Sequence, residues 1–242
     1  MTGTRLTRRH VRALSEPPRQ TVYVFELPVR IVHWTVVLCL IVLSITGLYI
    51  EHPVQTGPAT PLGHPGFTLG EVRFIHEVTA FVFIAAVLFR IYWAFAGNQY
   101  AHWRGLLPIT RAQRRDLRDT LRFYTYLRRR PVLLNGHNPL AGMAYVALYV
   151  LFIVTILTGL GLYAWLLRRP PWTTLFGWTY GVVPISMLRL VHFLLMFMYG
   201  GFAVHHVYSA FLYDVEEHNG ELSSMFTGYK NNVMTESEDA IP

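Results

Sequence analysis

The chain has 242 residues, of which 52% are hydrophobic and only 14% are charged, against roughly 25% charged residues in soluble proteins. This length suits one domain, and the composition argues against a soluble fold and for lipid exposure. The formal charge of +7 does not indicate a nucleic-acid-binding protein, because the arginines lie between long apolar runs, where the positive-inside rule accounts for them. Cys39 is the only cysteine, which excludes an intrachain disulfide and a cysteine-ligated iron–sulfur cluster.

Four segments are long and apolar enough to cross a membrane, which takes about 20 mostly apolar residues. They run from about 29–50, 74–96, 140–167 and 185–213. The basic segment before the first of them lacks the small-residue cleavage pattern of a signal peptide, so we expect it to be retained. The pattern predicts an all-α integral membrane four-helix bundle that forms a single membrane domain over 1–242.

The arginine distribution predicts how these spans are oriented. Positive residues favour the cytoplasmic side, so we expect both termini and loop 97–139 to be cytoplasmic. The other two loops, rich in Pro and Gly, should face outward, and the polar tail at 214–242 should be flexible. The arginines on which this orientation rests are Arg5, Arg8, Arg9, Arg12, Arg19 and Arg30 in the N-terminal segment, and Arg104, Arg111, Arg114, Arg115, Arg118, Arg122, Arg128, Arg129 and Arg130 in the loop.

Loop 97–139 also carries apolar side chains at helical spacing, namely Leu117, Leu121, Tyr124 and Leu127. With arginines between them, they are typical of an amphipathic helix that lies on the inner membrane face. A basic loop that only sets the topology would have a similar composition, so both interpretations stay open.

Histidines inside the spans are the main functional candidates, because ionisable residues are costly in a membrane. They are His33, His76, His192 and the adjacent His205 and His206. His192 and His206 are separated by 14 positions, so they share one face of the fourth span, about 21 Å apart along its axis. His205 lies about 140° around the helix from His192, and geometry therefore selects His206 as the partner in register.

The predicted orientation places these histidines at two depths. His33 and His206 should lie near the inner side, and His76 and His192 near the outer side. A six-coordinate haem needs two axial ligands from facing helices, and bundle cores are where such sites are built. The sequence thus predicts two bis-histidine haems, one with the pair His33/His206 and one with His76/His192, in line across the membrane.

Two other uses of intramembrane histidines are less consistent with this pattern. Zinc prefers one compact tetrahedral cluster, which two pairs at different depths do not make. A proton or metal transporter would be expected to have acidic partners deep in the spans, and Glu77, near a span end, is the only candidate.

Small and basic residues near these depths have two interpretations each. The glycines would let a flat macrocycle approach the backbone, or simply allow close helix packing. The arginines would pair with haem propionates, or extend to the membrane interface. The residues concerned are Gly47, Gly159, Gly161, Gly200 and Gly201, and Arg30, Arg73 and Arg189.

Several motifs resemble one known family along nearly the whole chain. RIVHW in the first span, RFIHE in the second, and RLVH followed by HHVY in the fourth are similar to the b-type cytochrome subunit of membrane-bound nickel–iron uptake hydrogenases. The stretches GHPG and GHNPLAGMAY are also similar to that family. The gamma subunits of formate dehydrogenases share the same plan of four helices and two haems, and remain the alternative.

The resemblance implies an electron-transfer subunit of the cell inner membrane. Its haem b ligands would be His33, His76, His192 and His206. Electrons would come from a periplasm-facing hydrogenase, through the iron–sulfur clusters of its small subunit, and leave to membrane quinone. The chain has no nickel site and no nucleotide-binding glycine loop, so hydrogen oxidation itself would belong to the partner's large subunit.

The quinone site is the least determined feature. We expect it near the inner haem, where His205 and Tyr208 are polar, although both residues also suit the membrane interface. Four histidines in the loops and the tail are expected to be solvated or to contact a partner, namely His52, His64, His137 and His218.

Overall fold

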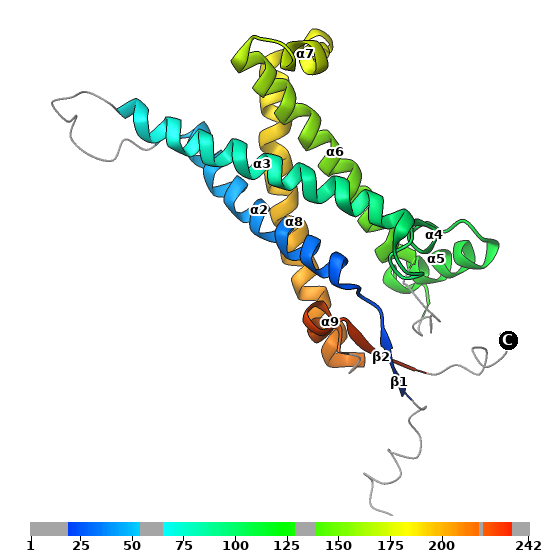
Figure 1. The fold of residues 1–242 in the computed structure, drawn as a ribbon. Coiled ribbons are helices and arrows are strands. Elements are labelled where there is room, and N and C mark those ends of the chain that lie inside the picture. The colour runs from blue at the N-terminus through cyan, green and yellow to red at the C-terminus, as the bar shows by residue number, and fades with distance from the viewer. Residues whose placement is uncertain (1–18, 54–64, 129–138, 218–219, 234–242) are drawn as a thin grey trace, which may run out of the picture.

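The computed structural model describes residues 19–53, 65–128, 139–217 and 220–233, and four long helices dominate it (Figure 1). They are α2 (Leu27–Glu51), α3 (Pro65–Ala96), α6 (Pro139–Leu167) and α8 (Ile185–Glu217). Each contains an apolar window long enough to span a bilayer, and at most 17% of such a window is buried within the chain. Most of the apolar surface therefore faces outward, as lipid exposure requires. The chain is a multi-pass membrane protein.

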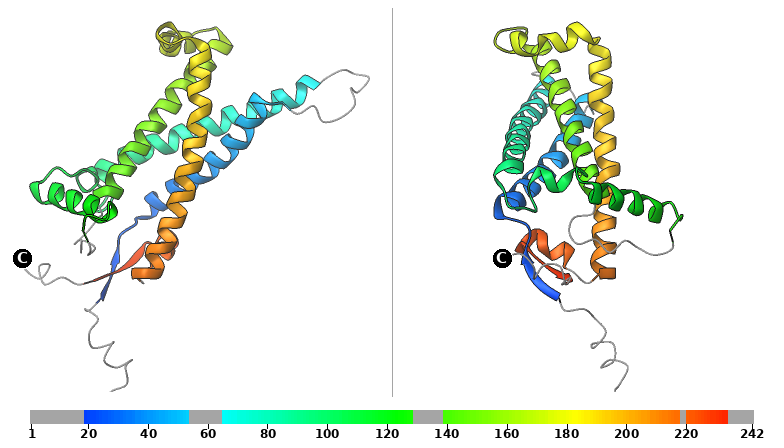
Figure 2. Two further views of the ribbon diagram at one scale, coloured as in Figure 1. Left: turned by 180° about the vertical axis from the view of Figure 1, so that it is seen from behind. Right: turned by 90° about the vertical axis from the view of Figure 1, so that its right-hand side faces the viewer.

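The four long helices form two pairs that cross. α2 packs along α3, while α6 packs against α8, and the views in Figures 1 and 2 show the first pair inclined to the second. The helices meet in a buried core midway along the bundle, made of Cys39, Phe83, Val87, Phe152, Leu195 and Tyr199. Phe152 is at its centre, with ring contacts to Phe83 at 5.1 Å and to Tyr199 at 5.3 Å.

One end of the bundle is closed by a helix that the sequence analysis did not predict. The segment after α6, expected to be a loop rich in Pro and Gly, contains helix α7 (Trp172–Val182). α7 packs on α6, where Thr179 is buried against Gly161. A Cβ atom at Gly161 would collide with the Thr179 hydroxyl, so this glycine serves helix packing rather than the approach of a cofactor.

The opposite end carries a small two-stranded sheet, so the fold is mostly helical rather than all-α. Strand β1 (Arg19–Tyr23) pairs antiparallel with β2 (Tyr229–Val233), and Thr21 lies opposite Asn231. Helix α9 (Glu221–Thr227) connects α8 to β2 (Figure 1). The tail, expected to be flexible, therefore forms a helix and a strand up to Val233. Strand β2 pairs with a segment about 200 residues away in the sequence, so no local sequence pattern predicts it.

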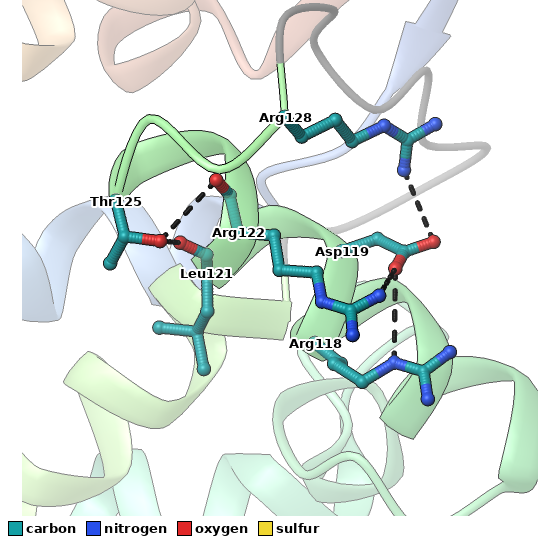
Figure 3. A network of polar contacts seen from close by, with 6 residues as sticks. All are labelled: Arg118, Asp119, Leu121, Arg122, Thr125 and Arg128. Atoms are coloured by element: carbon teal, nitrogen blue, oxygen red, sulfur yellow. Dashed lines mark hydrogen bonds and ion pairs between the residues drawn. The ribbon is translucent and has the colours of Figure 1, made fainter.

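The arginine-rich loop contains two further helices, α4 (Trp103–Leu106) and α5 (Arg111–Tyr124), both of which contact α6. Figure 3 shows that Asp119 on α5 gathers arginines around its carboxylate. Its oxygens lie 3.1 Å from Arg128, 3.8 Å from Arg118 and 3.9 Å from Arg122. α5 ends at Tyr124, so Leu127 lies beyond the helix. Arg129 and Arg130 lie outside the described residues, as do Arg5, Arg8, Arg9 and Arg12.

Candidate functional site

The four histidines selected by helical phase lie in two pairs, each made by two different helices. His33 on α2 faces His206 on α8, with ring centroids 6.3 Å apart. His76 on α3 faces His192 on α8, with ring centroids 6.5 Å apart. We call the first the sheet-end pair and the second the α7-end pair, after the ends of the bundle to which each is nearer.

These spacings are too long for a direct hydrogen bond and suit one metal ion between the rings. An imidazole nitrogen lies about 2 Å from a bound metal ion and about 1 Å from its own ring centre, so two axial rings on one metal ion have centroids about 6 Å apart. At the same separation, the nearest nitrogens of the two rings would be about 4 Å apart, beyond hydrogen-bond range. Both pairs meet the condition for shared axial ligation.

Threonine hydroxyls hold both rings of the α7-end pair. Thr46 Oγ1 on α2 lies 2.8 Å from His76 Nδ1, and Thr158 Oγ1 on α6 lies 3.0 Å from His192 Nδ1. Each hydroxyl donates its single proton to the carbonyl four residues earlier, at 2.7 Å to Val42 and 2.9 Å to Val154. A hydroxyl whose proton is used by a helix carbonyl accepts from the ring. That arrangement puts the histidine proton on Nδ1 and leaves the lone pair of Nε2 for a metal ion.

Glycines follow both threonines and give the rings room. A Cβ atom on Gly47 would lie 3.5 Å from His76 Cε1, and one on Gly159 would lie 3.0 Å from His192 Cε1. The second approach is tighter than ordinary van der Waals contact, so glycine is required more strictly at 159 than at 47. Gly200 and Gly201 have nothing within 4 Å of such a Cβ atom and line neither pair in this way.

The sheet-end pair is positioned by aromatic neighbours instead. The His33 ring meets Trp34 edge-on at 5.2 Å, and His206 stacks on Phe202 at 5.6 Å with 7° between the ring planes. His33 Nδ1 is buried and has no hydrogen-bond partner among the described residues. His205 is exposed, with Nε2 3.5 Å from the Ser209 hydroxyl, so it is turned away from this pair.

The chain's own C-terminal segment covers this end. Trp34 Nε1 donates to the Met225 carbonyl at 3.2 Å, and its ring packs on Phe226 at 4.9 Å. Arg30, one turn before His33, donates to the Phe226 carbonyl, whereas its Nε is buried without a partner in the described part of the chain. A buried guanidinium nitrogen beside the pair is available to an anionic group such as a propionate.

Two other arginines predicted near these depths are exposed. Arg73 and Arg189 sit close to His76 and His192 in sequence, on the outside of their helices. Sequence analysis missed Arg90, which belongs to α3. Arg90 follows His76 by 14 positions, the same separation as between His192 and His206 on α8. Both Nη atoms of Arg90 lie 3.4 Å from the Ala101 carbonyl. Its spacing places it at the level of the sheet-end pair.

The remaining histidines form no further site in the described ranges. His52 follows the end of α2 and lies 6.4 Å from the Phe193 ring, and His102 caps α4 by accepting from the Arg104 N–H at 3.3 Å. The others, His10, His64, His137 and His218, fall outside the description. No three His, Cys, Asp or Glu side chains cluster as a metal site within 19–53, 65–128, 139–217 and 220–233.

Comparisons with known proteins agree with this arrangement. Residues 24–228 match the family model described as prokaryotic cytochrome b561. The chain is 36% identical to the probable Ni/Fe-hydrogenase B-type cytochrome subunit of Cupriavidus necator, over 86% of each chain. It is also 36% identical to the corresponding hydrogenase 1 subunit of Escherichia coli K12, over 86% of this chain and 90% of that protein, and to the subunit of Rhodobacter capsulatus, over 88% and 82%.

The chain belongs to this family. It is a Ni/Fe-hydrogenase B-type cytochrome subunit of the prokaryotic cytochrome b561 family, as the sequence motifs predicted.

Membership implies haem b and association with a hydrogenase. The residues present fit haem b: each histidine pair has the spacing of two axial ligands, and the threonine contacts at Nδ1 of the α7-end rings leave Nε2 for the iron. Thr46 and Thr158, whose hydroxyls contact these two rings, were overlooked by the sequence analysis. The repeated Thr-Gly-Leu in the first and third spans was the signal that pointed to them.

Proposed function

We propose that this chain is a dihaem cytochrome b subunit that carries electrons between a hydrogenase and membrane quinone. The observation that carries the proposal is the near-equal spacing of two histidine pairs, 6.3 Å and 6.5 Å between ring centroids, at opposite ends of one buried core. His33 and His206 would hold one haem b, and His76 and His192 the other. Haem supplies one-electron redox chemistry when bound.

The polypeptide has separate tasks at the two sites. The four imidazoles would bind the haem irons. The two threonines keep the α7-end rings in the tautomer that leaves Nε2 free for iron. The apolar core excludes water from the space between the pairs. His192 and His206 are about 21 Å apart along α8, so a flat macrocycle at each pair would bring the two haem edges closer than the pairs themselves. One stiff helix thus fixes the distance for electron transfer.

We propose that the sheet end is cytoplasmic and the α7 end faces the periplasm, in the cell inner membrane. Support comes from the arginines: Arg104, Arg114, Arg115 and Arg122 lie in the loop at the sheet end, whereas Arg168 and Arg169 lead into α7. Electrons would enter at the α7-end pair and leave at the sheet-end pair.

The donor would be the hydrogenase small subunit, and through it the large subunit where hydrogen is oxidised. Cys39, buried in the core, is the only cysteine, so the chain itself cannot hold an iron–sulfur cluster. Quinone would accept electrons near the sheet-end pair, and lipid would cover the outward apolar surfaces of the long helices. The chain is an electron-transfer subunit and does not oxidise hydrogen alone.

The test is hydrogen-driven reduction of the haems in the purified complex. Hydrogen should reduce the b-type absorption, and added quinone should reoxidise it. His206→Ala should leave hydrogen able to reduce the remaining haem but should block quinone reduction. Co-purification with a molybdenum or tungsten enzyme and reduction by formate would instead assign the chain to a formate dehydrogenase. Absence of haem with ion uptake in vesicles would replace the proposal by a transporter.

A further inference from the structure

We propose that Thr46 and Thr158 are positioning residues that lower the midpoint potential of the haem at the α7-end pair relative to that at the sheet-end pair. This inference rests on the proposed function, because it requires a haem at each pair. Haem binding alone does not determine which of the two sites has the lower midpoint potential, and the inference concerns that order.

The structural basis is a clamp that occurs twice. Thr46 on α2 meets His76 on α3, and Thr158 on α6 meets His192 on α8, so each clamp joins two helices. Each threonine is followed by the glycine that the same imidazole touches. All four long helices of the bundle therefore contribute to one pair, and both rings of that pair are held alike.

The direction of hydrogen bonding determines the effect. Both hydroxyl protons are used by helix carbonyls, with a second carbonyl at 3.3 Å for Thr46 and 3.0 Å for Thr158. With the hydroxyl protons so placed, each ring donates Nδ1–H to the hydroxyl oxygen, and the Thr155 backbone is a further partner of His192. Donation of that proton raises the basicity of Nε2, and a more basic axial ligand stabilises ferric over ferrous iron. The potential at this pair should be lowered by both axial ligands.

The sheet-end pair lacks this arrangement. His33 Nδ1 is buried with no acceptor among the described residues, so its ring remains the weaker electron donor. The half-buried guanidinium of Arg30, three residues before His33, also opposes the additional positive charge of ferric iron, whereas the Glu221 carboxylate that acts on His206 is paired with Lys230. Both differences raise the potential at the sheet end relative to the α7 end. Electron movement from the α7 end to the sheet end is then favourable.

The experiment is a potentiometric titration of the haem absorption in the purified complex, with Thr46→Val, Thr158→Val and the double variant. Valine keeps the shape and removes the acceptor. Each single variant should shift the lower of the two midpoint potentials upward, the double variant should shift it further, and the higher potential should stay constant. Thr79→Val is the matched control, because the Thr79 hydroxyl on α3 donates to the Ile75 carbonyl at 2.7 Å and makes no hydrogen bond to a histidine among the described residues.

Serine variants separate the role of the threonine hydroxyl from that of the threonine methyl group. Thr46→Ser and Thr158→Ser keep the acceptor and should retain the wild-type potential and haem content, even if the valine variants hold haem about 10-fold more weakly. Loss of haem in both serine and valine variants would overturn the inference, because the methyl group would then be the essential part. So would an unchanged lower potential, or equal shifts at both haems. A wild-type complex with fewer than two haems would instead overturn the proposed function.

Discussion

The two histidine pairs have nearly the same spacing, yet the chain holds them by different means. At the α7 end, threonine hydroxyls from within the bundle bind both rings, and helix backbone binds the hydroxyls. At the sheet end, the rings rest on Trp34 and Phe202, and a C-terminal helix and strand cover them. One site is held by hydrogen bonds from neighbouring spans, and the other is closed by segments distant in sequence.

Under the proposed function, this difference matches a division of roles between the two ends. A site that receives electrons by tunnelling needs fixed ligands and no access for water. A site that serves a mobile quinone needs a nearby surface that the chain can adjust. Coverage by short elements, which open more readily than long packed helices, meets the second requirement.

Removal of a sheet-end histidine should have the largest effect, because it should remove one haem and leave the other. His206→Ala should reduce haem content from about two to about one per chain and spare the α7-end haem, because each pair is complete in itself. His205→Ala is the matched control, since His205 is exposed and contacts Ser209. Haem extraction with protein quantification measures both. Equal loss from the two variants would show that the phase assigned to α8 is wrong.

Disruption of the shared core should affect both ends together. Phe152 is 2% exposed and contacts both Phe83 and Tyr199, so Phe152→Ala should cost about 3–5 kcal/mol through the cavity it leaves. Phe197→Ala, at a residue 56% exposed to the outside, should cost much less. Thermal loss of haem absorption in detergent compares the two. Similar midpoints for both variants would argue that Phe152 does not pack between the sites.

The two clamp glycines allow a finer comparison within the α7 end. Gly159→Ala would place a Cβ atom 3.0 Å from His192 and should displace the ring, whereas Gly47→Ala places one at 3.5 Å from His76, which is ordinary contact. Low-temperature electron paramagnetic resonance of the ferric haems should change for the first variant and remain nearly unchanged for the second. The opposite order would contradict the geometry of the clamp.

The smallest expected effect concerns the cover at the sheet end. Trp34→Phe keeps an aromatic ring against Phe226 but removes the hydrogen bond to the Met225 carbonyl, which is worth about 1 kcal/mol. Hydrogen exchange of α9 should become faster, while exchange near Thr46 and Thr158 stays constant. A uniform increase along the chain would mean that the two ends are not independent.

Sequence alone predicted the four spans and the pairing partners because both depend on long, regular helices. Helical period and span direction were enough to separate His206 from His205. Thr46 and Thr158 were missed because a threonine in a span ordinarily bonds its own helix, and nothing local reveals the histidine it also meets. β1 and β2 were missed because their pairing joins Arg19–Tyr23 to Tyr229–Val233, and α7 because the prolines before it resembled a loop.

The central claim is that each histidine pair holds one haem, and haem stoichiometry with spectroscopy of the purified wild-type protein tests it most directly. The account predicts about two haems b per chain, with split b-type absorption and two low-spin ferric species that have bis-histidine character. One haem per chain, none, or a high-spin species with an open coordination position would contradict it.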